Sequence, residues 1–237
     1  MGRPRHRQSL RQPLSVRSSR GLFFLPQNAR GRRRSTPEEN VDGLFLPATE
    51  ELYPRPPEAM TFVEVPALSD TLCGAFRPGH FRGVATVVLK LFHLVEPDVA
   101  VFGEKDFQQL AVIRRLVEDL HLPIKIVGVP TVREADGLAR SSRNSYLSAI
   151  ERPLAGALFG ALNEAASALD RGLTAYDEIA AEGRHVLESK GFEVDYFAIR
   201  CLDDLGIPGP LEPRLVILVA ARLGRTRLID NLIVQRG

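Results

Sequence analysis

The chain has 237 residues, of which 44% are hydrophobic and 25% are charged, and a formal net charge of +2 that points to no particular partner. This ordinary globular profile suits one large domain or two modest ones, and no apolar run approaches the roughly 18 residues of a membrane span. The two cysteines, Cys73 and Cys201, lie far apart and in no metal-ligand spacing, which excludes a disulfide framework and favours a reducing, cytoplasmic location.

Residues 1–40 form a separate segment, rich in Arg, Ser and Pro and without periodicity. Such a segment buries too little apolar surface to offset the entropy of ordering, so we predict that it is disordered or spurious. Three interpretations stay open: an organelle transit peptide, a basic arm that touches nucleic acid, and an accidental N-terminus, which we favour. Its arginines, with no acidic residue among them, are Arg3, Arg5, Arg7, Arg11, Arg17, Arg20, Arg30, Arg32, Arg33 and Arg34.

Residues 41–132 show alternating strand and helix patterns. Short apolar or alternating runs predict strands, and apolar residues at helical spacing predict helices between them. Strand, helix and strand in this order indicate a parallel sheet with crossover helices, so the expected fold class is α/β. The predicted strands cover residues 41–46, 61–65, 99–102 and 124–129, and the predicted helices cover residues 84–95 and 107–120.

Residues 133–237 show a different order, two helices followed by consecutive strands. This order favours a separate, smaller α+β domain, with a boundary near residues 130–143. Gly224 between the last two strands suggests a hairpin turn. The predicted helices cover residues 153–168 and 174–190, and the predicted strands cover residues 192–200, 214–221 and 227–234.

The first cluster with chemical potential is Gly103-Glu104-Lys105-Asp106, which follows an apolar strand and opens a helix. Ligands of open α/β sheets sit at the carboxyl ends of strands, and a helix N-terminus there offers free N–H groups to phosphate. Lys105 would add a positive charge. The alternative is a plain turn with a solvated lysine. Gln108 and Gln109 follow, of which at most one can point into a site; alternatively both are solvated.

The second cluster covers residues 136–144, where two serines and an arginine follow a glycine in a loop. Hydroxyl and guanidinium groups bind phosphate, and such a loop can close over a triphosphate. The alternative is a polar linker whose serines cap the next helix. A third stretch, residues 77–83, places two arginines around a turn before a helix, as an anion site or a helix cap, and its His80 is more often structural than catalytic.

Taken in order, these segments resemble the pantothenate synthetase (pantoate–β-alanine ligase) family, from about Val41 to Gln235. The matching stretches are residues 52–54, 77–83, 102–110, 127–130, 133–139, 141–144 and 227–231. The resemblance implies an ATP-dependent ligase that makes pantoyl-adenylate from pantoate and ATP and then transfers the pantoyl group to β-alanine. It implies a Rossmann-like nucleotidyltransferase domain with a smaller C-terminal domain, a homodimer, and Mg²⁺ that accompanies ATP.

Carried over by position, the resemblance assigns ATP binding to two segments and pantoate binding to Gln109, without protein metal ligands. Lys105, Ser141, Ser142 and Arg143 would act in catalysis. The ATP-binding set is Gly103, Glu104, Lys105, Asp106, Val132, Arg140, Ser141, Ser142 and Arg143. The implied domains are residues 1–40 as an Arg-rich segment, 41–132 as an incomplete ATP- and pantoate-binding domain with a partial parallel sheet, and 133–237 as the α+β domain.

The sequence departs from the family pattern at two points. Arg140 stands where the family has Met or Leu. The family's His-x-Gly-His element has no counterpart, because the histidines at positions 6, 80, 93, 121 and 185 include no two that are three apart. We therefore expect the first part of the sheet to be missing and the chain alone to be poorly stable and nearly inactive. Two alternatives to a ligase remain, a catalytically dead fragment and, less favoured, a basic-arm nucleic-acid binder.

Overall fold

The computed structural model describes residue 45 and residues 47–236. The predictions for residues 1–40, and for all of the strand at 41–46 except Phe45, lie outside these residues. Phe45 is exposed and belongs to no helix or strand. Contacts divide the chain into two units. Unit 1 takes the described part of Met1–Phe102 and Val112–Val127, and unit 2 takes Gly103–Ala111 and the described part of Gly128–Gly237.

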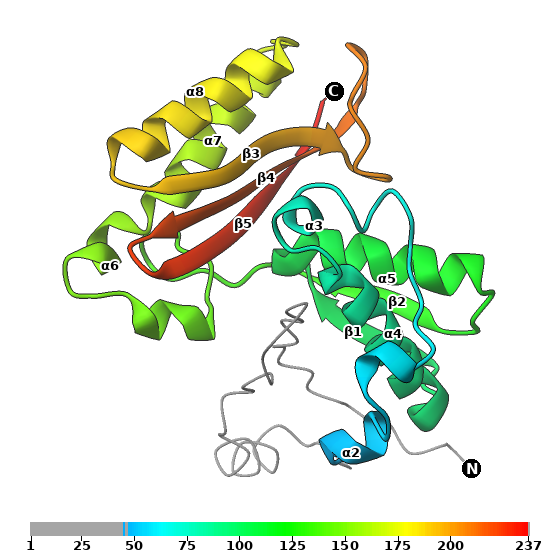
Figure 1. Ribbon diagram of the computed structural model, residues 1–237. Helices are drawn as coiled ribbons and strands as arrows, with labels where there is room; N and C mark the ends of the chain where they lie inside the picture. Colours follow the sequence, from blue (N-terminus) through cyan, green and yellow to red (C-terminus); the bar gives the residue numbers. More distant parts are fainter. Residues whose placement is uncertain (1–44, 46, 237) are drawn as a thin grey trace, which may run out of the picture. The chain divides into compact units, whose positions relative to one another are not determined.

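Unit 1 begins with short helical segments and one long helix, drawn in blue to green in Figure 1. The short segments are α2 (Thr49–Leu52), the 3₁₀ turn η1 (Pro57–Ala59) and α3 (Cys73–Phe76), and the long helix is α4 (His80–Val95). Lys90 of α4 donates to the Leu52 carbonyl at 2.5 Å and lies over the Tyr53 ring. A cation at the carboxyl end of a helix satisfies a carbonyl that lacks an intrahelical partner.

The predicted helix at 84–95 is confirmed and begins earlier, at His80, after Gly79 with φ 76°. The predicted strand at 61–65 is wrong, because these residues form no ladder in the described chain. The Val63 amide instead donates to the Thr86 hydroxyl at 2.9 Å. The alternation of apolar residues therefore corresponds to a half-buried segment that packs on α4 and pairs with no described strand.

A β-α-β unit follows, as predicted. It consists of β1 (Val99–Gly103), the 3₁₀ turn η2 (Glu104–Asp106), α5 (Phe107–Asp119) and β2 (Lys125–Val129). The two strands pair in parallel as a two-stranded sheet. The apolar stripe of α5 is buried at Leu110, Ile113 and Leu116.

The rest of unit 2 is a three-stranded antiparallel sheet with helices on one face (Figure 1). Its strands are β3 (Glu193–Cys201), β4 (Arg214–Leu223) and β5 (Thr226–Gln235), in the order β3-β4-β5. The helices α7 (Ala157–Asp170) and α8 (Tyr176–Ser189) share a core with alternate residues of the sheet, including Leu215, Ile217 and Val219. Burial of large aliphatic side chains of this kind stabilises a domain by about 1.5–3 kcal/mol each.

The predicted strands of this region are confirmed, and so is the hairpin, since Leu223 pairs with Thr226 across Gly224, whose φ is 54°. The single helix predicted at 153–168 is two helices, α6 (Glu151–Leu154) and α7, separated at Ala155 and Gly156. In the part of the chain that the structure describes, no helix has the length and apolar character needed to cross a bilayer.

Candidate functional site

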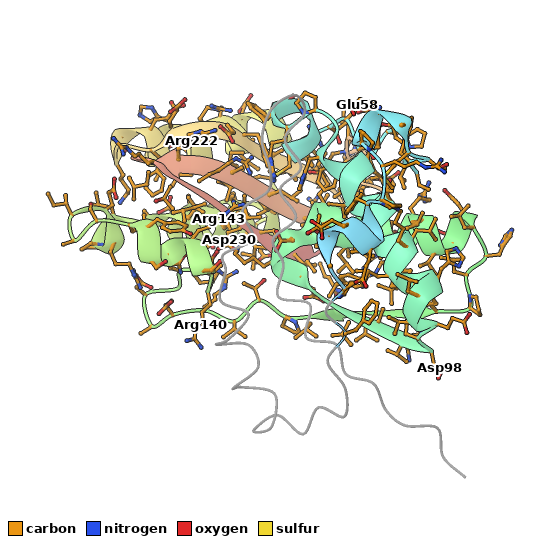
Figure 2. All side chains as sticks on the ribbon, turned by 60° about the horizontal axis from the view of Figure 1, so that its bottom comes forward. Glu58, Asp98, Arg140, Arg143, Arg222 and Asp230 are labelled. Atoms are coloured by element: carbon orange, nitrogen blue, oxygen red, sulfur yellow. The ribbon has the colours of Figure 1, made fainter. Side chains whose placement is uncertain are left out.

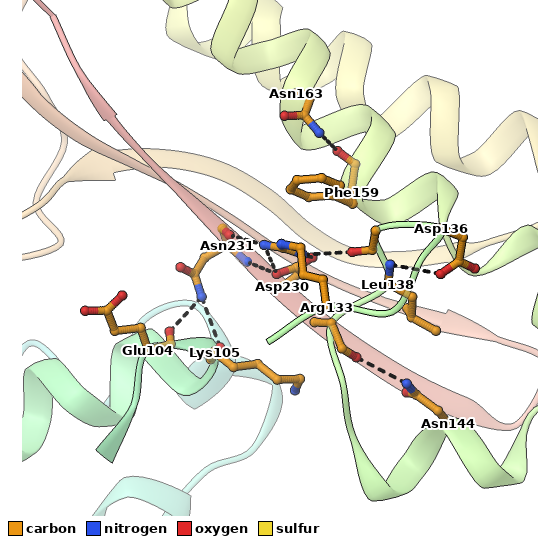
Figure 3. A network of polar contacts seen from close by, with 12 residues as sticks. Glu104, Lys105, Arg133, Asp136, Leu138, Asn144, Phe159, Asn163, Asp230 and Asn231 are labelled. Atoms are coloured by element: carbon orange, nitrogen blue, oxygen red, sulfur yellow. Dashed lines mark hydrogen bonds and ion pairs between the residues drawn. The ribbon is translucent and has the colours of Figure 1, made fainter. Parts of the chain in front are cut away.

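The turn after β1 presents the first candidate cluster. Gly103 ends the strand, η2 covers the next three residues and α5 begins at Phe107. The Glu104 carboxylate packs against Gly128, where a Cβ would lie 2.7 Å from Oε1. Figure 3 shows the Lys105 side chain extending the opposite way from that of Glu104. The Lys105 ammonium has no recorded hydrogen bond or ion pair with a described residue, so it remains available to an anion.

The two glutamines of α5 are both buried, with exposed fractions of 4% for Gln108 and 7% for Gln109. The alternative in which both are solvated is therefore wrong. No hydrogen bond from the Gln109 amide to another described residue is recorded. An amide with donors and an acceptor that no described residue uses is a suitable group for a polar ligand.

The second cluster follows a tight reversal of the chain at residues 132–140. Arg133 pairs with Ala139 in an isolated antiparallel bridge. The Arg140 amide donates to the Val132 carbonyl at 2.8 Å. Gly137, at φ 85°, makes the turn, and a Cβ there would lie 2.4 Å from the Phe159 ring. Only glycine combines this backbone conformation with this close approach.

The residues that follow the reversal form η3 (Ser142–Tyr146), a 3₁₀ turn. The Ser141 hydroxyl accepts a hydrogen bond from the Arg143 amide at 3.2 Å. Capping by a serine, one of the two interpretations of this loop, is thus confirmed for Ser141. Arg140 and Ser142 are exposed and Arg143 is half-buried. Figure 2 places the Arg140 side chain at the outer edge of the ribbon, and neither arginine has a recorded ion pair with a described residue.

A buried ion pair joins the reversal to β5. The Arg133 guanidinium donates to both carboxylate oxygens of Asp230, at 2.6 and 3.1 Å, and to the Gly137 carbonyl at 3.0 Å. The Asp230 side chain is 1% exposed. The guanidinium also stacks on the Phe159 ring, 3.8 Å from its centroid. Bidentate pairing with further hydrogen bonds from both terminal nitrogens is the geometry that offsets the cost of burying two charges.

The next residue of β5 reaches the first cluster. The Asn231 side-chain amide donates to the carbonyls of Glu104 and Lys105, at 2.9 and 3.0 Å (Figure 3). All of these residues belong to unit 2. The turn at Glu104 and Lys105 and the start of the reversal at Arg133 are therefore both held by the same dipeptide of one strand.

Asp136, in the same reversal, accepts hydrogen bonds from Arg152 of α6 and from the Leu138 amide. The hydrogen bond from Arg152 lowers the pKa of the Asp136 carboxyl, partial burial opposes this shift, and the Leu138 amide adds to the lowering. The pair is half-exposed and fixes the outer side of the reversal.

His80 lies apart from these groups, in unit 1, and is buried as the first residue of α4. Its Nε2 is 3.1 Å from Nη1 of Arg77. A guanidinium offers only donors, so Nε2 is the acceptor in this contact. The contact supports the structural interpretation of His80, as part of the helix start.

Comparison with known proteins shows to which protein family the chain belongs. The family described as pantoate-beta-alanine ligase matches residues 23–233. The chain belongs to this family. Pantothenate synthetase from Shewanella amazonensis is 55% identical over 224 residues, which are 94% of this chain and 79% of that protein. The enzyme from Methylococcus capsulatus is 53% identical over 208 residues, 84% of this chain and 73% of its own length.

Solved structures agree with the assignment to the pantoate-beta-alanine ligases. Pantothenate synthetase from Thermus thermophilus superposes with a TM-score of 0.84 at 43% identity, over 93% of this chain and 79% of that one. The pantoate-beta-alanine ligase from Francisella tularensis, complexed with beta-gamma ATP and beta-alanine, has a TM-score of 0.68 at 29% identity, over 88% of this chain and 70% of that one. The α/β class predicted from the sequence is confirmed.

Three residues of the site were not singled out from the sequence: Arg133, Asp230 and Asn231. They lie within stretches that match the ligase family, but the sequence pattern assigns them no chemistry. Arg133 and Asp230 are 97 positions apart, so no local spacing reveals their pairing. Asn231 stands in an apolar strand, where a polar residue in a buried position was the one available signal.

Proposed function

We propose that this chain condenses pantoate with β-alanine at the expense of ATP. The pantoate carboxylate attacks the α-phosphorus of ATP and the bond to the β-phosphate breaks, which releases pyrophosphate. The β-alanine amine then attacks the acyl carbon of pantoyl-adenylate, loses a proton, and displaces AMP. The observation that carries the proposal is that the two polar segments bearing the family's motifs are fastened to one strand, β5.

The roles follow from the chemistry of each group. Lys105 would neutralise charge that develops on the phosphates, and the amides of residues 103–106 would donate to phosphate oxygens. Arg140, Ser141, Ser142 and Arg143 would hold the pyrophosphate portion. The Gln109 amide would bind pantoate, and the Val132 backbone would contact adenine.

Mg²⁺ fits this arrangement as a companion of ATP. Within the described ranges, no group of three or more His, Cys, Asp or Glu is placed to hold a metal ion. Mg²⁺ commonly takes most of its ligands from phosphate oxygens and water, with one or two carboxylates. Bound Mg²⁺ would offset phosphate charge.

The test is an assay of AMP release coupled to pantothenate formation, with the purified 237-residue chain, ATP, Mg²⁺, pantoate and β-alanine. Because the His-x-Gly-His element has no counterpart, we expect slow turnover that depends on all three substrates. Lys105→Met should lower kcat by about 100-fold or more, the typical cost of removing a group that stabilises transition-state charge. Lys125→Met is the matched control, since Lys125 is an exposed lysine at the opposite end of the parallel strand pair.

A second candidate, binding of ATP and pantoate without ligation, is favoured by the histidine spacing, because the family's His-x-Gly-His element has no counterpart among positions 6, 80, 93, 121 and 185. Calorimetry separates the two functions. Saturable ATP binding with no AMP release supports the second candidate, and AMP release with the Lys105→Met defect supports the first.

We further propose that the protein is a cytoplasmic homodimer, and that its functional domains divide near residues 132 and 133. Family resemblance supports the dimer, and the two free cysteines support a reducing compartment. Light scattering on the purified chain tests the dimer: a mass twice the 26.2 kDa of the chain is expected, and a monomer at micromolar concentration would contradict it.

A further inference from the structure

Two neighbouring residues of β5 use opposite faces of the strand. Successive side chains of a strand point to opposite sides of the sheet. Leu228 and Val234 belong to the core shared with α7 and α8, so the even-numbered positions of β5 face the helices. Asp230 is on that face and forms an ion pair with Arg133, which itself stacks on Phe159 of α7. Asn231 is on the other face, and its side-chain amide donates to the backbone carbonyls of Glu104 and Lys105.

The contact from Asn231 fixes the direction of specific amide groups. In a planar trans peptide the C=O and the following N–H point in opposite directions. The carbonyls of Glu104 and Lys105 therefore belong to the same peptide planes as the N–H groups of Lys105 and Asp106. Because Asn231 holds both oxygens, at 2.9 and 3.0 Å, it aims both N–H groups away from β5. These are among the first amides of a helix start, which lack intrahelical acceptors.

The contact from Asp230 fixes the other segment. Arg133, held by Asp230, also donates to the Gly137 carbonyl at 3.0 Å and to the Asn231 carbonyl at 3.3 Å. The Asp230 carboxylate in turn accepts a hydrogen bond from the backbone N–H of Asn231 at 2.8 Å. The reversal ends at Arg140, immediately before the Ser141–Arg143 segment. The ion pair thus fixes the reversal that leads into that segment.

We infer that Asp230 and Asn231 are positioning residues for the triphosphate of ATP. Asp230 holds Arg133, and through it the reversal that leads into the 140–143 loop. Asn231 orients the amides of residues 105 and 106. The dipeptide thereby sets the spacing between the two phosphate-binding segments. This inference rests on the proposed function, since it assigns these segments to ATP. We assign neither residue a contact with the reacting atoms.

The decisive variant is Asn231→Asp, which keeps the size of the side chain, removes both N–H donors and places a carboxylate against two carbonyl oxygens. The matched control is Asn163→Asp on α7, where an exposed asparagine amide likewise donates to a backbone carbonyl, that of Phe159 at 2.8 Å. Asn231→Gln keeps the donor amide on a longer side chain. Arg133→Lys keeps the charge of the guanidinium and loses its bidentate geometry.

Binding of β,γ-methylene ATP and of AMP to the full chain is measured by calorimetry, at a temperature well below the melting point of every variant. We expect Asn231→Asp to weaken binding of the ATP analogue at least about tenfold and AMP binding less, because the triphosphate uses the oriented amides. Asn231→Gln should recover part of the loss, Arg133→Lys should also favour AMP over the analogue relative to the parent, and Asn163→Asp should change neither affinity.

The outcomes separate the inference from the function on which it rests. If the unsubstituted chain does not bind the ATP analogue, the proposed function fails and the inference fails with it. If the unsubstituted chain binds the analogue and Asn231→Asp binds it equally well, or loses AMP and analogue binding in equal measure, the positioning role is wrong while the proposed function stands. Should Asn231→Asp not fold, Asn231→Gln and Arg133→Lys decide by the same comparison.

Discussion

The carboxyl of Asp136 shows how a single residue of the reversal responds to pH. Arg152 and the Leu138 amide donate to it, and together they lower its pKa in the folded chain despite partial burial. A carboxyl whose pKa is lower when folded than when unfolded stabilises the fold at a pH above the unfolded value, about 3.9. That contribution is lost as the pH falls through the folded pKa.

We therefore predict that Asp136→Asn destabilises the protein at pH 7 and has no effect in strong acid. The Asp136 side chain is 37% exposed, so the loss at pH 7 should stay within about 1 kcal/mol, the range of exposed ion pairs. Urea unfolding of both proteins from pH 7 to pH 2 measures the difference in the free energy of unfolding, which should shrink below about pH 4.

The control for this series is Glu164→Gln, which removes an exposed carboxylate of α7 that has no recorded ion pair with a described residue. It should leave the stability at pH 7 unchanged. A constant difference between Asp136→Asn and the parent from pH 7 to pH 2 would show that the Arg152 contact contributes no pH dependence.

Residues of the candidate site differ in how far the sequence could predict them. Lys105 and Ser141 could be proposed because residue type and local position, after an apolar strand or in a glycine loop, already suggest phosphate chemistry. Arg133 and Asp230 could not, because their meaning depends on a contact between a reversal and a strand far along the chain. The fate of a polar residue inside an apolar strand, as at Asn231, is likewise set by tertiary structure.

At the scale of elements, two glycines inside neighbouring helices make a matched pair. Gly160 is exposed in α7, and a Cβ there would meet no atom within 4 Å. Gly183 is buried in α8, and a Cβ there would lie 2.6 to 2.8 Å from atoms of the Phe197 ring of β3. Alanine is favoured over glycine in a helix interior by about 1 kcal/mol at either position, so only the surroundings differ.

We predict opposite effects of the same substitution. Gly160→Ala should raise the free energy of unfolding by about 0.5–1 kcal/mol, from helix propensity alone. Gly183→Ala should lower it by about 1–3 kcal/mol, the usual cost of overpacking, because the Phe197 ring must move. Thermal or urea unfolding of the two variants measures both effects. A gain in stability for Gly183→Ala would mean that α8 and β3 separate at little cost.

The same reasoning explains which elements could be predicted. The long helices and the hairpin strands follow from periodicity, with Gly191 and Gly224 in left-handed conformations where the chain stops or turns. Residues 61–65 have the alternation of a strand, yet alternation cannot show whether another strand lies beside them. The break between α6 and α7 could not be predicted from the apolar pattern either, because the two residues at the break, Ala155 and Gly156, are both small.

At the scale of the whole molecule, the main apolar core of unit 2 lies within a continuous stretch of chain. Its buried members run from Leu138 to Val234 and come from α7, α8 and the three-stranded sheet. The α+β arrangement predicted for this part of the chain therefore corresponds to a core whose buried members all come from this one stretch. Asp230 lies within this stretch and Arg133 lies just before it, whereas Glu104 and Lys105 come from a part of the chain further upstream.

We accordingly predict that residues 128–237, expressed alone, fold cooperatively. The segment retains the complete core and the buried ion pair, and loses the two hydrogen bonds from Asn231 to the earlier turn, so its stability should be modest. Near-ultraviolet circular dichroism and a single urea transition would report specific packing. Ile217→Asp in the same segment is the control, because Ile217 is 0% exposed and an unpaired charge there should abolish the transition. A gradual, non-cooperative transition of the unsubstituted segment would mean that its core depends on the rest of the chain.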